Sequence, residues 1–380
     1  MTRREWLAIV SAASAAPLAR AAGNSDAPAA PAAPVSIAKC ASYDEDIAAK
    51  LGAMFDQLGG LEKLVRNKTV AIKLNMTGSP SLRVRGLAPA RTHYVHPKLV
   101  GAAAYHLGRA GAKRIRFVES PWATAGPLEE VMLDSGWNPR ALLAAASGVE
   151  FENTNALGKG KSYARFRVPG SAYMYPAYDL NRAYDETDVF VSMAKLKNHE
   201  TCGVTLSLKN CFGNLPASIY GDDSGVDEPN ESPRSGREAV GHRGRRQPSK
   251  SAPQELHFGA NHDPGYRVPH IVADLVAARP IHLAIIDGVE SIAGGEGPWI
   301  GGVRLVKPGV LLAGLNPVST DAVTMAVMGY NPRAMRGTAP FKTCDNTLAL
   351  AEGHGIGTTD LKRIEVRGTP IEQALYRFDG

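Results

Sequence analysis

Short apolar runs alternate along this chain with segments whose apolar residues recur at helical spacing. The runs typical of buried strands lie at residues 35–38, 69–75, 114–119, 149–152, 188–193, 282–287, 310–314 and 363–366. The helical patterns lie at residues 44–57, 97–110, 128–136, 269–278 and 317–328, with one more starting near residue 204. Strands separated by helices predict βαβ units. We therefore expect an α/β fold of Rossmann-like βαβ units, with a largely parallel sheet and helices on both faces.

One long segment interrupts this alternation. Residues 221–263 are rich in glycine, proline, serine, aspartate and arginine, and they show no apolar periodicity. A structureless loop of this length inside a compact domain is usually functional or disordered. We predict a single α/β domain over residues 35–380 that carries this segment as a flexible insertion. The insertion could act as a lid, with His242 or His257 closing on a ligand.

The first 22 residues have the layout of a bacterial export signal. Arginines occupy positions 3 and 4, an aromatic residue and a leucine follow, and residues 7–18 are apolar. Residues 19–21 form an A-x-A-like cleavage site, and residues 23–34 are an alanine- and proline-rich linker. This order predicts a twin-arginine signal peptide over residues 1–22, export by the twin-arginine translocase and a periplasmic protein. The alternative is a disordered basic N-terminus that contains Arg-Arg by chance.

Composition limits the choice of ligand. The charged fraction of 21% is ordinary, and the formal charge of +6 is a mild bias that gives no reason to expect nucleic acid. After the signal, no segment is apolar and long enough for a membrane helix, so we expect no stable span in the mature chain. No C-x-x-C motif for an iron–sulfur cluster, dinucleotide fingerprint or P-loop occurs, so the cofactor stays open, a divalent metal included. The cysteines at positions 40, 202, 211 and 344 could form disulfides in the periplasm or remain buried thiols.

Polar side chains follow several of the expected strands, where the chain leaves the sheet. In parallel sheets, ligands bind outside the carboxyl ends of the strands. Lysine seldom lies at the end of a buried strand unless it is paired or faces a site. The side chains at these ends are Lys73, Asn75, Glu119, Lys195, Lys197, His199 and Asp287. We therefore expect a lysine-rich ligand site at this edge of the sheet.

The segment from residue 195 to residue 213 carries the densest set of such groups. Two lysines and His199 precede a glycine, and the helix that follows places Thr205 and Lys209 on one face, with Asn210 beside them. Backbone N–H groups at the start of that helix can hold an anion, and the lysines add positive charge. This pattern predicts a site for a phosphate, a carboxylate or an anionic intermediate.

An alternative accounts for the same lysines without a ligand. They could pair only with carboxylates, such as Glu119, Glu200 or Asp287. Glu296, in the glycine-rich segment 294–298, could likewise pair with a lysine, hold a divalent metal, or act as a general acid or base.

Two further side chains stand at expected helix starts. His96 precedes a proline that begins a helix, and we expect it to cap that helix or line the site rather than bind a metal. Asp321 lies in the first turns of the helix at residues 317–328, where a carboxylate suits the helix dipole. Its alternative role is to face the site.

Several segments together resemble the bacterial and archaeal family called domain of unknown function 362. They are residues 71–75, 92–97, 195–199, 204–213, 286–288, 297–298 and 317–322. The similarity runs from about residue 35 to residue 328 and is most specific in the lysine–histidine and Thr-x-x-x-Lys-Asn segments. Some members carry a ferredoxin-like domain with a cysteine motif for four-iron clusters, which this sequence lacks. The resemblance therefore implies the fold and the site, but neither a reaction nor a redox role.

The leading hypothesis is an exported enzyme that acts on a small anionic substrate. The anion would be held by Lys73, Lys195, Lys197 and Lys209, oriented by Asn75 and Asn210, and contacted by Thr205, His96 and Glu119. His199, with Asp287 or Glu296, would move protons, and Lys209 would join them if neighbouring charges lower its pKa. The rival hypothesis is a periplasmic binding or cofactor-carrying protein without catalysis. A third is a structural partner of an exported redox complex.

Overall fold

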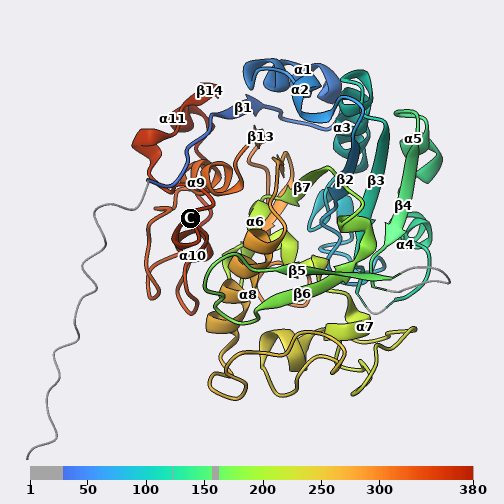
Figure 1. The fold of residues 1–380 in the computed structure, drawn as a ribbon. Helices are drawn as coiled ribbons and strands as arrows, with labels where there is room; N and C mark the ends of the chain where they lie inside the picture. Colours follow the sequence, from blue (N-terminus) through green and yellow to red (C-terminus); the bar gives the residue numbers. More distant parts are fainter. Residues whose placement is uncertain (1–28, 123, 156–161, 380) are drawn as a thin grey trace, which may run out of the picture.

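The computed structural model describes residues 29–122, 124–155 and 162–379, so the predicted signal peptide at residues 1–22 lies outside the described residues. Eight strands form one sheet (Figure 1). They are β1 (Val35–Lys39), β2 (Thr69–Lys73), β3 (Arg114–Glu119), β4 (Val149–Asn153), β7 (Val189–Lys195), β10 (Leu283–Gly288), β13 (Val310–Gly314) and β14 (Val366–Gly368). Their order is β14-β1-β13-β10-β7-β2-β3-β4, and every neighbouring pair is parallel except the two that contain β13. The prediction of an α/β fold with a largely parallel sheet is confirmed.

Helices cover both faces of this sheet, because side chains alternate between the faces along each strand. On β7, Val191 and Met193 pack on one face, whereas Phe190 and Ala194 pack on the other. The first face is covered by α1 (Ile47–Gln57) and α3 (Pro97–Arg109), and the second by α6 (Leu206–Asn210), α8 (Pro264–Ala278) and α9 (Pro317–Val327). Burial on both faces explains why these strands read as continuous apolar runs. None of the described helices is long and apolar enough to cross a membrane.

Helix α8 begins five residues before the start expected from the sequence. The Asp263 side chain caps it by accepting a hydrogen bond of 2.9 Å from the Gly265 N–H, and Pro264 opens its first turn. Pro269 therefore lies inside the helix and lacks the N–H that would bond the Gly265 carbonyl. The Asp345 N–H donates to that carbonyl instead, at 2.8 Å, so the helix tolerates this proline.

Short hairpins and helices complete the fold. The hairpins pair β5 (Tyr163–Arg167) with β6 (Ala177–Asn181), β8 (Asn198–His199) with β9 (Gly203–Val204), and β11 (Ser291–Ala293) with β12 (Arg304–Val306). The short helices are α2 (Glu62–Val65), α4 (Leu128–Asp134), α5 (Pro139–Leu143), α7 (Ala217–Tyr220), α10 (Thr347–Gly353) and α11 (Ile371–Ala374). Apart from α4, which the sequence predicts at residues 128–136, each is too short to produce a clear period in the sequence.

The insertion at residues 221–263 lies beside α7 and α8, in the lower part of Figure 1. It holds to α8 through Arg267, whose guanidinium donates two hydrogen bonds of 2.7 Å to the buried carboxylate of Glu255. A one-turn π-helix, Glu238–His242, lies at the centre of the insertion and contacts α8. A buried ion pair between Arg267 and Glu255 therefore joins the insertion to α8, one of the helices on the second face of the sheet.

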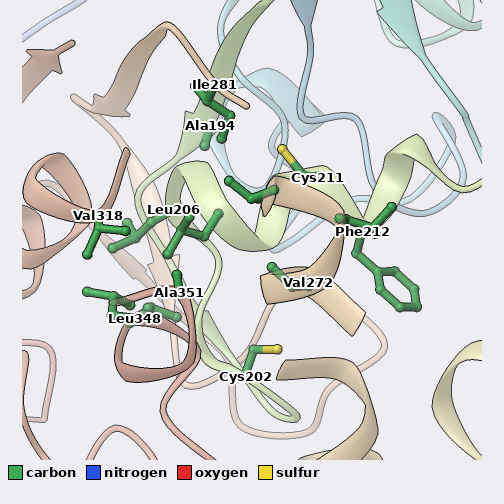
Figure 2. Packing of buried hydrophobic residues seen from close by; sticks show 14 of the residues in the cluster. Ala194, Cys202, Leu206, Cys211, Phe212, Val272, Ile281, Val318, Leu348 and Ala351 are labelled. Carbon is green, nitrogen blue, oxygen red and sulfur yellow. The ribbon is translucent and has the colours of Figure 1, made fainter. Parts of the chain in front are cut away.

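The core beneath α6 is apolar and includes three of the four cysteines, two of which are labelled in Figure 2. In this view, Leu206 and Val318 pack beside Leu348, and Cys202 and Cys211 lie among apolar neighbours. All four cysteines are free and buried. The structure therefore contains the buried thiols, one of the two states that the sequence left open.

Candidate functional site

A cavity of about 570 Å³ opens at the carboxyl ends of β2, β3 and β7. Its walls come from these strand ends, from α6, from the insertion and from the loop that follows β11. Nine of the expected site residues line it: Lys73, Asn75, Glu119, Lys197, His199, Thr205, Lys209, Asn210 and Glu296. Lys195, Asp287 and His96 are not part of its lining. The structure thus brings most, but not all, of the expected groups together.

Lys73 forms one wall and is paired with a carboxylate. Its ammonium lies 2.6 Å from Glu119 Oε1, and both side chains are buried. Glu119 also accepts hydrogen bonds of 2.8 Å from the N–H groups of Met76 and Ser120. Asn210 accepts from Lys73 Nζ at 3.4 Å and donates to the Lys73 carbonyl at 3.3 Å. The contacts of Lys73 therefore agree with the alternative in which this lysine pairs with a carboxylate and holds no ligand.

Lys197 is fully buried at the cavity wall without a carboxylate partner. Its Nζ donates to the carbonyls of His93 and Glu296, both at 2.9 Å. Burial holds the pKa of Lys197 well below its usual value, and the nearby charges of Lys209 and Lys195 act in the same direction. A neutral amine has two N–H groups, and the two carbonyls accept both of them.

Lys209 differs from the other lysines because no carboxylate or carbonyl holds it. Within the part of the chain that the structure describes, its ammonium has a single ring contact, 4.7 Å from the centroid of Phe212, and no hydrogen bond or ion pair. Burial lowers its pKa. One helical turn earlier, the buried Thr205 hydroxyl also has no hydrogen-bond partner. Two unsatisfied donors therefore face the same cavity.

His199 and Glu296 stand side by side at the cavity. His199 Nδ1 accepts a hydrogen bond of 3.2 Å from the Thr201 N–H and lies 3.8 Å from Glu296 Oε2. Burial and the neighbouring lysine charges hold the pKa of the imidazole well below its usual value, although Glu296 opposes this shift. Glu296 accepts hydrogen bonds from the Glu200 N–H at 3.0 Å and from the Trp299 indole at 3.1 Å.

The pKa of Glu296 is lowered to about 2 although burial alone would raise it. A protonated His199 would contribute the largest lowering effect, but burial keeps that imidazole neutral near pH 7. The two hydrogen-bond donors are then the interactions that hold Glu296 in its ionised form. Glu296 is therefore a carboxylate whose charge is satisfied by hydrogen-bond donors of the protein.

Four charged or titratable groups of the cavity come from the insertion: Arg237, Glu238, His242 and Arg243. The Arg237 guanidinium donates to the Leu215 carbonyl at 2.7 Å and contacts Ser120 Oγ. His242 Nδ1 donates to the Arg237 carbonyl at 3.1 Å, and its ring lies 5.0 Å from that of Phe212. Arg237 was absent from the expected site because the insertion has no apolar period that would place it. His242 was expected only as a residue of a lid.

Trp299 forms part of the rim and was also missed. Its ring lies so close to Gly78 and Gly297 that an added Cβ would come within 2.3 Å and 2.2 Å of it. Only glycine fits at these two positions without moving the ring, which explains the Gly-Pro-Trp sequence at residues 297–299. The glycine-rich segment at residues 294–298 is evident in the sequence. The large side chain of Trp299 directly after it is the feature that indicates a ring packed against these glycines.

Lys195 and Asp287 form a closed network on the opposite face of the sheet. Their side chains are 0% exposed and 3.1 Å apart, and the Tyr43 hydroxyl accepts from Lys195 and donates to Asp287, both at 2.7 Å. His96 contributes its backbone N–H to Asp287 at 2.9 Å. Since Val191, Met193 and Lys195 alternate onto the face covered by α1 and α3, Lys195 turns away from the cavity.

This placement corrects three of the expected roles. Asp287 does not reach His199, so the two cannot move protons together. Lys195 cannot hold a ligand in the cavity, because its ammonium is already bound by Asp287, Tyr43 and the Ala90 carbonyl. His96 stacks on Tyr43 at 3.6 Å and caps α3 by accepting from the Lys98 N–H, so of its two expected roles the cap is confirmed and the contact with a ligand is not. Burial lowers the pKa of His96 to about 4.

The start of α6 does not offer free backbone donors to a ligand. The N–H groups of Ser207 and Leu208 donate to the carboxylate of Asp321, each at 2.9 Å, and the Ser207 hydroxyl does so at 2.6 Å. Asp321 is fully buried, and burial raises its pKa to about 7 despite these hydrogen bonds. Asp321 therefore caps α6 rather than α9, the helix in which it lies. Its side chain does not face the cavity.

The residues that the structure describes contain no group of three or more histidine, cysteine, aspartate or glutamate side chains arranged to hold a metal ion.

Comparisons with known proteins agree with part of this description. The model of the family described as "Domain of unknown function (DUF362)" matches residues 70–326. The chain is 25% identical over 187 residues to the thylakoid-associated protein sll1697 of Synechocystis, which covers 49% of this chain and 51% of that protein. The chain thus spans about half the length of this curated relative.

Two solved structures share a weaker likeness. A Thermotoga maritima protein is 12% identical with a TM-score of 0.33, over 69% of this chain and 53% of that one. The lactate racemase apoprotein of Thermoanaerobacterium thermosaccharolyticum is 10% identical with a TM-score of 0.33, over 72% of this chain and 54% of that one.

Proposed function

The chain belongs to the DUF362 family, and we propose that this member is an exported enzyme that acts on a small anionic molecule bound in the cavity at the carboxyl ends of β2, β3 and β7. One observation carries the proposal. The Lys209 ammonium and the Thr205 hydroxyl face that cavity without any hydrogen-bond partner in the described part of the chain. An unpaired, half-buried cation is costly, and a bound anion would remove that cost.

The charges around the cavity favour an anion over a cation. Of the four carboxylates that line the cavity, Glu119 is paired with the Lys73 ammonium, Glu296 accepts from hydrogen-bond donors, Glu238 is paired with Arg243, and Glu200 is exposed to solvent. Lys209, Arg237 and Arg243 place positive charge on the wall. What remains available to a ligand is therefore a set of donors and positive charge, which suits a phosphate or a carboxylate.

Removing the Lys209 charge tests this proposal. We expect Lys209→Met to weaken binding of inorganic phosphate or acetate by about 10- to 100-fold, because a hydrogen bond to a charged group contributes roughly 1.5–3 kcal/mol. Isothermal titration calorimetry on the purified mature chain measures the change. Lys342→Met, at an exposed position outside the cavity, is the matched control and should bind like the wild type. Equal affinities for Lys209→Met and wild type would overturn the proposal.

Export by the twin-arginine pathway is a separate part of the proposal and has its own test. Replacing both arginines at positions 3 and 4 with lysine keeps the charge but removes the recognised pair. We expect the variant to remain in the cytoplasm as an uncleaved precursor, whereas the wild type is found shortened in the periplasm. Immunoblots of cell fractions measure both. A variant that is exported as efficiently as the wild type would contradict this route.

The ligand itself can be sought directly. A protein purified from the periplasm under mild conditions, then heated, should release a small anion detectable by mass spectrometry. Retention of that anion by a variant that lacks turnover would separate the enzyme from the alternative, a binding or carrier protein without catalysis.

A further inference from the structure

Two histidines line the cavity and are held by the backbone in opposite tautomers. His199 Nδ1 accepts from a backbone N–H, that of Thr201, at 3.2 Å, so this nitrogen carries a lone pair. His242 Nδ1 lies 3.1 Å from a backbone carbonyl, that of Arg237, so this nitrogen must carry the proton. An N–H group can only donate and a carbonyl can only accept, which determines both assignments.

The Nε2 atoms of the two rings therefore have opposite chemistry. A neutral His199 carries its proton on Nε2, whereas a neutral His242 carries a lone pair there. Both residues line the cavity, and neither Nε2 has a protein partner among the described residues. Burial lowers the pKa of both imidazoles, so both rings are neutral near pH 7.

We infer that His242 is the proton acceptor of this site, that His199 is a hydrogen-bond donor, and that the ligand is a small anion with a hydroxyl or amino group. This inference rests on the proposed function, because the anionic group is placed at Lys209 and Thr205. The ligand's O–H or N–H would then donate to His242 Nε2. His199 would donate to an oxygen of the ligand, a role different from the proton transfer expected from the sequence.

The surroundings of His242 suit a ring that gains a proton. Proton transfer would break the ligand's O–H or N–H bond, leave the electron pair on the ligand atom and form an imidazolium at His242. Glu238 Oε2 lies 3.7 Å from Nδ1, and Glu296 also favours the charged ring. Lys209 opposes it, but the same ammonium stabilises negative charge that develops on the ligand. The Phe212 ring covers one side, and the Arg237 carbonyl holds the Nδ1 proton.

The tautomers can be observed without knowing the ligand. In the full-length mature protein labelled with ¹⁵N-histidine, long-range ¹H–¹⁵N spectra near pH 7 distinguish the two neutral tautomers and the imidazolium. His199→Gln and His242→Gln identify the two signals by their loss. We expect the Nε2–H pattern for His199 and the Nδ1–H pattern for His242. The same tautomer in both rings, or a positive charge on either, would overturn the inference.

A pair of ligands that differ by one hydroxyl group tests the substrate class. We expect glycolate to bind about 2- to 10-fold more tightly than acetate, the range that one net hydrogen bond provides. His242→Leu should abolish this preference, so that glycolate and acetate bind the variant equally. His257→Leu, at an exposed position of the same insertion, is the control and should keep the preference. Equal binding of glycolate and acetate by the wild type contradicts the inference.

The two proposals fail in different ways. If phosphate, acetate and glycolate all fail to bind the wild type, the anion site is wrong. If they bind but glycolate has no advantage, the anion site stands and the role of His242 is wrong. The tautomer spectra decide the assignment of the two rings in either case.

Discussion

Replacing Asp287 with alanine is expected to lower the free energy of unfolding by about 3–5 kcal/mol, because the change leaves the buried Lys195 ammonium without its countercharge. Both side chains are 0% exposed, and they are 3.1 Å apart. The alanine also removes an acceptor for the Tyr43 hydroxyl and for the His96 N–H. Burial already lowers the pKa of Lys195, so in the variant this lysine should lose its proton on folding.

A charge-free replacement of the pair distinguishes structure from catalysis. Lys195→Met combined with Asp287→Leu should recover much of the lost stability, since apolar pairs often replace buried ion pairs well. Urea unfolding measures both variants, and the double variant should bind phosphate like the wild type. Asp227→Ala is the control, because Asp227 pairs with Lys250 on the surface, where such a pair contributes about 0–1 kcal/mol. If the double variant is stable but cannot bind anions, the Lys195–Asp287 pair contributes to anion binding, and a purely structural role is wrong.

The stability of this protein should depend on pH through Asp321. Burial raises its pKa to about 7 in the folded chain, whereas an unfolded aspartate has a pKa near 3.9. Between these values the folded state binds the proton and the unfolded state does not, so stability falls as pH rises. The slope is about 1.4 kcal/mol per pH unit, and the full loss is about 4 kcal/mol above pH 7.

Comparison with Asp321→Asn isolates this contribution from all other titrating groups. Unfolding free energies of both proteins are measured in urea at pH 5, 6, 7 and 8. The wild-type value minus the variant value should fall from pH 5 to pH 7 and then level off. A constant difference over the whole range would mean that the hydrogen bonds from Ser207 and Leu208 keep the carboxylate ionised throughout.

Lys73 and Lys195 show how far the sequence can predict the site. Each ends an apolar strand pattern, so the strands and the polar side chains at their ends were predictable. Alternation also groups residues by face, but the pattern does not say which helices cover that face. The neighbours of Lys195 depend on the register that places it opposite Asp287, and the crossover between β7 and β10 sets this register. That information lies in tertiary packing and not in the local sequence.

The residues missed by the sequence analysis come from loops. Arg237 and Trp299 have no periodic neighbours, so no pattern assigns them to a face. Arg237 reaches the cavity because the insertion is attached to α8 by the buried contact between Arg267 and Glu255, which are 12 positions apart in sequence. Trp299 reaches it because two glycines leave room for its ring. Both depend on contacts that form only when the fold is complete.

The strand order has a consequence for how the chain is made. In the sheet, β1 lies between β13 and β14, and it pairs with no other strand. Among the described residues, β1 is therefore without a strand to pair with until residues 310–314 have been synthesised. This part of the sheet is therefore held together by contacts between segments far apart in the sequence, β1 with β13 and β1 with β14.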